Sequence, residues 1–335
     1  MANNSYLTQQ NIMAVKERIQ QNTPIEAILK EMCLTPDQLE EVLIRLRHRD
    51  SFRAFAGYSF FDPSLCDRDE YIRQMGYGDS IITPNFEPLS IAVCSDMHGV
   101  SIDDKPKLVD RMYDEIINRR IKHIVVNGDV TEGTEYHLSK RGQDRIRVEP
   151  TLDAQFAYMN RFLPFDKSVI WHINQGNHDI FKNNGISIDF VKEFQLRHDR
   201  PDIVSTGIED TILPINNDCI HLLHQNYLDF IKPYLKRLEN AEEKQVIFIG
   251  HGHFPHSDDT DGYYAEFLPA MCDQPKGSDE QKAMFYMGFD IVTFLFDTKT
   301  GKFNYMIIEP FVYNDMFNTL KELRPQTIAI RRLKK

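Results

Sequence analysis

The segment from residue 91 to residue 99 has the sequence IAVCSDMHG, which places Asp96 and His98 directly after a short apolar run. A near-continuous hydrophobic run such as residues 91–94 is typical of a strand that is covered on both faces. In an extended segment, Asp-x-His puts both side chains on the same face, so that both can reach one ion. A single Asp-x-His is more often a coincidence or a capped turn than a ligand pair. This segment therefore indicates a fold only together with similar ones.

Four further clusters of the same residue types follow short apolar runs. A lone Gly-Asn-His-Asp could be an ordinary turn, because all four residue types tolerate turns. In open α/β sheets, however, ligands bind outside the carboxyl ends of the strands, so we expect all five clusters to converge on one rim. Five clusters in this order leave little room for coincidence, and they predict a metal site. The four clusters are Asn127-Gly128-Asp129, Gln175-Gly176-Asn177-His178-Asp179, Leu222-Leu223-His224 and Gly250-His251-Gly252-His253.

The residue types in these clusters indicate which metals would bind. Carboxylates, amide oxygens and neutral imidazoles together suit manganese, iron or zinc better than magnesium alone. Two such ions, roughly 3.5–4 Å apart, would clamp a phosphate and lower the pKa of a water nucleophile. We therefore expect two divalent ions, with manganese as the first choice and iron, zinc or magnesium as alternatives.

The pattern around the clusters predicts an α/β fold. Amphipathic stretches at residues 105–120 and 152–162 lie between the apolar runs, and this alternation is typical of an α/β domain. Residues 284–297 and 302–309 are expected to form a hairpin that turns at residues 297–301. The expected organisation is a helical module at 1–50, an aromatic-rich connector at 51–88, an α/β domain at 89–315 and a basic C-terminal tail at 316–335, frayed at its end.

The first fifty residues have the outline of a helix-turn-helix. Thr23-Pro24 and Thr35-Pro36 each place a capping hydroxyl and a first-turn proline at a helix start. In DNA-binding proteins the second helix of this motif enters the major groove. Here that helix would begin with Asp37-Gln38-Leu39-Glu40-Glu41, whose carboxylates repel phosphates. A protein partner or self-association through residues 1–50 is therefore preferred to contact with DNA.

Composition restricts the class of protein. The chain has 335 residues and a formal net charge of -11, so contact with nucleic acid requires a local basic patch. Its five scattered cysteines include no CxxC pair, which excludes a zinc ribbon and suits a reducing compartment. The start lacks the basic and apolar regions of a signal peptide, and no apolar stretch approaches the roughly 20 residues that span a bilayer. We expect a cytoplasmic protein that does not enter membranes.

The order of the motifs resembles that of the calcineurin-like metallophosphoesterases. The signature of that family is Asp-x-His, Gly-Asp, Gly-Asn-His-(Glu or Asp), a lone His and then Gly-His-x-His, and all five parts occur between Leu89 and about Tyr313. The resemblance implies a four-layer α/β/β/α sandwich, in which two stacked sheets are flanked by helices. It also implies a phosphoesterase with a two-metal site.

The resemblance assigns roles to individual residues. His178 matches the family histidine that donates a proton to the leaving oxygen, and Asp179 either orients His178 or occupies a surface turn. Of His221 and His224, we prefer His224 as the lone histidine because it closes the apolar run. The implied ligands are Asp96, His98 and His253 for the first ion and Asn177, His224 and His251 for the second, with Asp129 bridging the two.

Departures from the family pattern bear on the substrate. Protein phosphatases of the family have an arginine shortly after Gly-Asp and use Gly-Asn-His-Glu, whereas this chain continues Val130-Thr131-Glu132 and has Gly-Asn-His-Asp. An insertion at 134–149 carries Lys140, Arg141, Arg145 and Arg147, and it is either a solvated loop or a basic lip that grips phosphates beside the scissile one.

The basic insertion, the helix-turn-helix outline and the basic tail favour a polynucleotide substrate. We expect a metal-dependent phosphodiesterase, foremost a DNA nuclease similar to the repair exonucleases of the family. A phosphomonoesterase or nucleotide phosphatase is the alternative. A third possibility is a DNA-binding or scaffold protein with an inactive domain. The complete ligand set and the presence of His178 argue against this possibility.

Overall fold

The chain divides into two units, residues 1–66 and 67–335. The computed structural model describes residues 14–15, 25–35, 81–133, 146–148, 151–183, 186–225, 227–241, 243–253, 255–273, 287–316, 319–323 and 329–333. In the first unit, α2 (Ile25–Met32) follows the Thr23-Pro24 start signal, and the next residue, Cys33, has a φ of 53°. The expected second helix of the helix-turn-helix lies outside the described residues.

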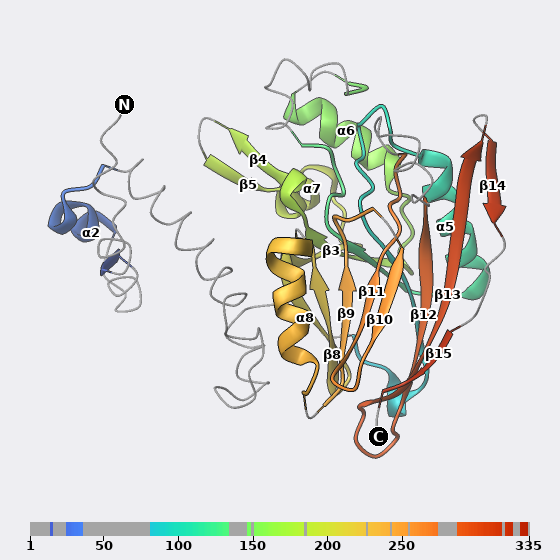
Figure 1. Ribbon diagram of the computed structural model, residues 1–335. Helices are drawn as coiled ribbons and strands as arrows, with labels where there is room; N and C mark the ends of the chain where they lie inside the picture. The colour runs from blue at the N-terminus through green and yellow to red at the C-terminus, as the bar shows by residue number, and fades with distance from the viewer. Residues whose placement is uncertain are drawn as a thin grey trace. The chain divides into compact units, whose positions relative to one another are not determined.

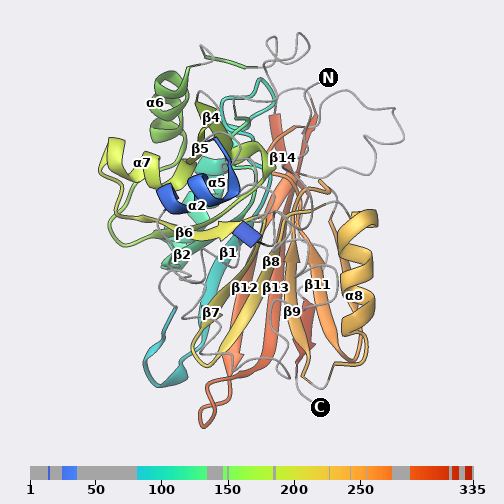
Figure 2. The same cartoon turned by 90° about the vertical axis from the view of Figure 1, so that its left-hand side faces the viewer.

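The larger unit contains a sheet whose central strands are parallel, and Figures 1 and 2 show this unit from two sides. Strands β1 (Leu89–Cys94), β2 (His123–Asn127), β3 (Ile170–Gln175) and β6 (Ile203–Ile208) lie side by side in this order. On the other side of β1 the sheet continues antiparallel through β12 (Met287–Phe296) and β13 (Phe303–Met316). The apolar runs predicted from the sequence are confirmed as strands, and so is the hairpin at residues 297–301.

A second sheet has the order β10-β11-β9-β8-β7. Its strands β8, β9 and β11 are parallel, and its edge strands pair antiparallel with their neighbours. A separate hairpin is formed by β4 (Ile180–Asn183) and β5 (Ile186–Asp189). The bounds in the second sheet are β7 (Asp210–Ile215), β8 (Asp218–Leu223), β9 (Gln245–Ile249), β10 (His256–Asp259) and β11 (Tyr263–Phe267).

Side-chain alternation along β1 explains how the two sheets and the helices form layers. Ile91 and Val93 belong to a core shared with Leu222 and Phe248 of the second sheet, whereas Ala92 and Cys94 belong to a core shared with the helices. Successive side chains of a strand point to opposite faces, so one strand can serve both cores. Helices α5 (Pro106–Arg119), α6 (Leu152–Phe162) and α7 (Phe190–His198) contribute to the helical core.

The fourth layer is α8 (Lys232–Leu238), which lies along the second sheet in both views (Figures 1 and 2). The Tyr234 hydroxyl of this helix is 3.0 Å from Nδ1 of His221 on β8. The arrangement confirms the expected α/β/β/α sandwich. Short turns complete the described elements, namely η2 (Pro84–Phe86), η5 (Asn177–Asp179) and the π-helical turn η6 (Tyr227–Ile231).

The C-terminal segment differs from the frayed tail that the sequence predicts. Strands β14 (Thr319–Leu323) and β15 (Ala329–Arg332) both pair with β13, and Leu333 after β15 is 5% exposed. Backbone pairing and the burial of Leu333 therefore hold residues 319–323 and 329–333 on the first sheet, despite the basic residues among them. No helix among the described residues is both long and apolar enough to cross a membrane.

Candidate metal centre

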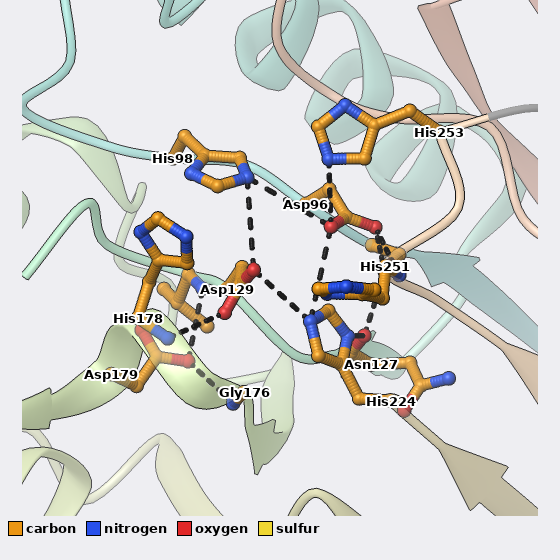
Figure 3. A network of polar contacts seen from close by, with 12 residues as sticks. Asp96, His98, Asn127, Asp129, Gly176, His178, Asp179, His224, His251 and His253 are labelled. Atoms are coloured by element: carbon orange, nitrogen blue, oxygen red, sulfur yellow. Dashed lines mark hydrogen bonds and ion pairs between the residues drawn. The ribbon is translucent and has the colours of Figure 1, made fainter. Parts of the chain in front are cut away.

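The ends of five strands from both sheets bring predicted site residues together, and Figure 3 shows the ligand candidates Asp96, His98, Asp129, His224, His251 and His253. One oxygen of Asp96, Oδ1, lies 3.0 Å from Nε2 of His253, 3.8 Å from Nε2 of His98 and 3.9 Å from Nε2 of His224. The other oxygen accepts hydrogen bonds from the Ser95 hydroxyl and from the backbone N–H of His251. The carboxylate is therefore held from one side and faces imidazoles on the other.

Asp129 lies between histidines of the two expected ligand sets. Its Oδ2 is 3.0 Å from Nε2 of His224 and 3.7 Å from Nε2 of His98. Its Oδ1 accepts a hydrogen bond of 2.9 Å from the backbone N–H of His178. This position suits a carboxylate that bridges two ions.

The hydrogen bonds of His224 and His98 fix which nitrogen faces the site. Nδ1 of His224 is 2.7 Å from the Asn127 carbonyl oxygen, and Nδ1 of His98 is 2.6 Å from Oε2 of Glu132. Because a carbonyl or carboxylate oxygen only accepts, each Nδ1 carries a proton, and Nε2 is the nitrogen that offers a lone pair to the site when the ring is neutral. Such a partner behind a ligand histidine is typical of metal sites.

Three buried atoms at the centre of this arrangement make no hydrogen bond within the described part of the chain: Asp96 Oδ1, His98 Nε2 and His224 Nε2. With both rings neutral, all three atoms are electron-pair donors that face one another, an arrangement that is repulsive without a proton or a metal ion between them. Buried polar atoms are normally satisfied, so the exceptions require an explanation. A divalent cation with oxygen and imidazole ligands satisfies all three, and the residues present therefore fit the metal that the motifs predict.

The backbone of the site is strained at the ligand positions. The φ angles of Asp96, His98, Asp129, His251 and His253 are 52°, 44°, 49°, 70° and 55°. Residues with a Cβ atom rarely adopt these left-handed angles, and such strain gathers at functional sites. The sharp turns aim side chains from adjacent strand ends at one point.

Two glycines allow this close approach. A Cβ atom on Gly128, whose φ is 87°, would lie 2.0 Å from Nδ1 of His224. A Cβ atom on Gly176 would lie 2.2 Å from Oδ1 of Asp129. Any side chain at either position would displace a residue of the site.

The charges of the site act strongly on one another. Burial would raise the pKa of Asp96, but His253, His224 and His98 hold this pKa well below its usual range. Burial would lower the pKa of His224, but Asp129 and Asp96 raise it to about 9. The negative charge that favours these protons favours a divalent cation equally, and the binding of a metal would displace them.

His178 lies beside the ligands and is anchored by the backbone. Its Nδ1 is 3.1 Å from the Glu132 carbonyl oxygen, and its ring meets the His98 ring edge-on at 4.8 Å between centroids. Burial lowers the pKa of His178. Its ring borders a pocket of about 180 Å³ that His98, Asp129 and His251 also line.

Asp179 is fully buried, so it does not occupy a surface turn. Its carboxylate accepts hydrogen bonds from the backbone N–H groups of Val130, Thr131 and Gly176, at 2.8–3.1 Å. These bonds tie the loop after β2 to the loop after β3. Asp179 thus positions the backbone that carries Asp129 and His178.

The model of the calcineurin-like phosphoesterase family matches residues 89–286. The chain belongs to this family. Its motifs and their order are those that the sequence analysis assigned to it.

Solved structures of phosphoesterases and of vacuolar protein sorting 29 (Vps29) are similar to the phosphoesterase domain at low sequence identity. A Vps29 variant from Entamoeba histolytica is 12% identical, with 73% of this chain and 100% of that chain covered and a TM-score of 0.40. An archaeal phosphodiesterase is 12% identical, with 67% and 99% covered and a TM-score of 0.37. The phosphoesterase Yfce from E. coli is 14% identical, with 65% and 98% covered and a TM-score of 0.34. No curated protein matches the chain in sequence.

The remaining predicted residues of the phosphoesterase site lie as follows. Asn177 begins η5 and is partly buried. His221 is turned away from the ligands, because its Nε2 is 3.1 Å from Oε1 of Gln245 and its Nδ1 contacts Tyr234. Of the two candidates for the lone histidine, the structure thus brings His224 to the site.

The basic residues of the insertion are only partly described. Arg147 donates to the backbone carbonyls of residues 101–102 and pairs with Asp104 at 2.9 Å, so its guanidinium group braces a neighbouring loop. Arg141 and Arg145 lie outside the described residues.

Sequence reasoning missed two residues of the site. Glu132 contacts His98, and Cys272 lies with His98 and His253 in a cluster whose ligand atoms are within 4.8 Å of one another. Glu132 follows the Gly-Asp motif by three residues and could have been considered, because carboxylates often stand behind ligand histidines. Cys272 belongs to no motif, and only the fold brings it to the site.

Proposed function

We propose that this phosphoesterase is a two-metal phosphodiesterase, and that its substrate is DNA. The observation that carries the proposal is the set of buried, unsatisfied donor atoms on Asp96, His98 and His224, beside a histidine that is not among the proposed ligands. A scaffold that had lost its activity would have no need to keep these strained and unsatisfied groups in place.

The proposed roles follow from the geometry. When bound, the two ions would supply Lewis-acid stabilisation of the phosphoryl group and activate a water nucleophile. One ion would be held by Asp96, His98 and His253. The other ion would be held by Asn177, His224 and His251, and Asp129 would be a ligand of both ions. His178, anchored through Nδ1, would protonate the leaving oxygen from Nε2, since the anionic phosphate favours the protonated ring.

The charges around the pocket support a diester in preference to a monoester. Asp103, Glu132 and Asp273 line the pocket, and none of its described lining residues is Arg or Lys. A phosphomonoester dianion is repelled by these carboxylates more strongly than a phosphodiester, which carries a single negative charge. The lack of an arginine shortly after Gly-Asp agrees with this preference.

The DNA part of the proposal rests on the basic insertion. Arg141 and Arg145 would contact the phosphates on either side of the scissile one, in a chain whose net charge of -11 otherwise repels a polyanion. Residues 1–50 would serve a protein partner or self-association.

The test is a gel assay of the purified chain with linear and circular DNA, in the presence of Mn²⁺. We expect degradation of linear DNA that requires the metal, and loss of this activity in both His178→Gln and Asp129→Asn. His178→Gln should still bind Mn²⁺, whereas Asp129→Asn should bind it weakly. Survival of circular DNA would indicate an exonuclease.

Three outcomes would contradict all or part of the proposal. Degradation that persists in His178→Gln would point to a contaminating nuclease or to a different proton donor. If DNA stays intact while bis(p-nitrophenyl) phosphate is hydrolysed in a metal-dependent way, the protein is a phosphodiesterase whose substrate is not DNA. Hydrolysis of p-nitrophenyl phosphate alone would make the protein a phosphomonoesterase.

A further inference from the structure

Cys272 is a buried thiol on the wall of the catalytic pocket that the proposed mechanism does not use. Cys272 is 3% exposed and lines the pocket together with His98 and His253. Burial alone does not distinguish it, because Cys94 is buried as well. Cys94, however, belongs to the apolar core between sheet and helices, where desolvation raises its pKa and keeps the thiol protonated.

Backbone hydrogen bonds hold Cys272 beside the first ligand segment. The N–H of Met271 donates to the carbonyl oxygens of Ser95 and Asp96, at 3.0 and 3.2 Å. On the other side, the N–H of Asp273 donates to the Asp103 carbonyl oxygen at 2.8 Å. The position of the thiol is therefore fixed by the same strand end that carries Asp96 and His98.

The thiol forms a cluster with two of the proposed ligands. The sulfur of Cys272 and one nitrogen each of His98 and His253 lie within 4.8 Å of one another. In a tetrahedral zinc site with Zn–S of about 2.3 Å and Zn–N of about 2.0–2.1 Å, neighbouring ligand atoms are roughly 3.3–3.6 Å apart. A contraction of about 1 Å, within reach of side-chain rotation, would close the cluster around an ion. Independently of the cysteine, Nε2 of His98 is buried and makes no hydrogen bond among the described residues.

We propose that Cys272 is a thiolate ligand of the ion that Asp96, His98 and His253 hold. The inference rests on the proposed function only in requiring that a metal binds at this site. On binding, the S–H bond breaks, its proton passes to solvent and the sulfur forms a bond to the metal. A thiolate favours zinc, iron or cobalt over manganese or magnesium. The ion position that Cys272 completes would therefore differ in metal preference from the other ion position.

The test uses cobalt(II) as the probe, bound to the full-length chain after removal of metal. We expect a thiolate-to-cobalt charge-transfer band in the near ultraviolet, in addition to the weaker visible bands of bound cobalt. Cys272→Ser should lose the charge-transfer band and keep the visible bands, which show that the site is still folded. Cys219→Ser, which changes a buried cysteine of β8, is the matched control and should keep both.

Metal competition provides a second readout that does not depend on activity. In Cys272→Ser, the affinity for Zn²⁺ should fall by roughly tenfold or more, because even the loss of a partner behind a ligand costs about 10–100-fold. The affinity for Mn²⁺ should change much less.

Two results would overturn the cysteine ligand and leave the metal centre intact. In the first, the wild type shows the visible bands without a charge-transfer band. In the second, the charge-transfer band survives in Cys272→Ser. Equal losses of Zn²⁺ and Mn²⁺ affinity would overturn the metal preference. The absence of all cobalt bands would overturn the metal centre itself, and the cysteine ligand with it.

Discussion

Glu132 shows how a single residue behind the ligands can control the site. Its carboxylate accepts from Nδ1 of His98, which leaves Nε2 directed at Asp96 and Asp129. Its backbone oxygen separately contacts His178. A change of the side chain therefore acts on the metal ligand and leaves the anchor of the proton donor in place.

We expect Glu132→Ala to weaken metal binding by about 10–100-fold, because the His98 ring loses the partner that fixes its tautomer and orientation. The measurement is titration of the metal-free protein with Mn²⁺ or Zn²⁺ by calorimetry. Glu243→Ala is the matched control, since Glu243 is exposed and pairs with Lys302. Equal affinities of the two variants would show that the His98–Glu132 contact does not tune the site.

Elements with strong hydrophobic patterns were predictable, and those without them were not. The runs that became β1, β2, β3 and β9 are buried on both faces, so their composition alone marks them as strands. The edge strand β10 has the sequence HSDD, and a polar edge strand carries no apolar signal. The same applies to β15, which has the sequence AIRR, so that its apolar run is only two residues long and basic residues follow it. Charge suggested a frayed end there, but pairing with β13 prevails.

The residues of the site, too, were predictable where they follow a hydrophobic strand and not predictable where they lie on a loop. Asp96, Asp129, His224, His251 and His253 follow apolar strands directly, so the topology that aligns the strand ends also aligns these residues. Glu132 and Cys272 lie on loops, whose course depends on long-range contacts that no local pattern encodes.

The packing of β15 predicts a measurable cost for Leu333→Ala. Leu333 belongs to the core between the two sheets, so its truncation should lower the free energy of unfolding by about 2–4 kcal/mol. Urea unfolding followed by the fluorescence of Trp171, the single and fully buried tryptophan, measures the change. Leu196→Ala is the matched control, because Leu196 is 77% exposed and should cost less than about 0.5 kcal/mol. Equal small costs would place the C-terminal segment outside the core.

The pairing of β2 and β3 brings two histidines together and predicts a pH dependence. Nδ1 of His123 is 3.0 Å from Nε2 of His172, so one neutral ring donates to the other. Burial lowers the pKa of His123 to about 4 and that of His172 to about 3. Between these values and the unfolded pKa of about 6.5, the unfolded chain binds protons that the folded chain does not, and stability is therefore lost as the pH falls.

For His172→Gln we expect a shallower decline of the unfolding free energy between pH 7 and pH 5, by up to about 1.4 kcal/mol per pH unit. Urea unfolding at a series of pH values measures the slope. His256→Gln, at an exposed histidine, should leave the slope of the wild type unchanged. If the unfolding free energy of His172→Gln declines with falling pH as steeply as that of the wild type, the pair of His123 and His172 does not oppose protonation in the folded chain.

At the scale of the whole molecule, the metal centre joins the two sheets. Asp96, Asp129 and Asn177 follow strands of the first sheet, whereas His224 and His251 follow β8 and β9 of the second. A net charge of -11 adds repulsion within the folded chain, which bound cations would relieve. Ions at this site would therefore act as a cross-link of the sandwich as well as catalysts.

Metal binding should consequently stabilise the whole fold. A ligand at 100 times its dissociation constant adds about 2.7 kcal/mol if it binds only the folded state. For a domain of this size that corresponds to a rise in Tm of roughly 5–10 °C, measured by calorimetry with and without chelator. Asp129→Asn should show little of this rise, because the residue proposed to hold both ions has lost its charge. A full rise in Asp129→Asn would place the stabilising ion elsewhere in the molecule, and the strand ends would then not be the metal centre.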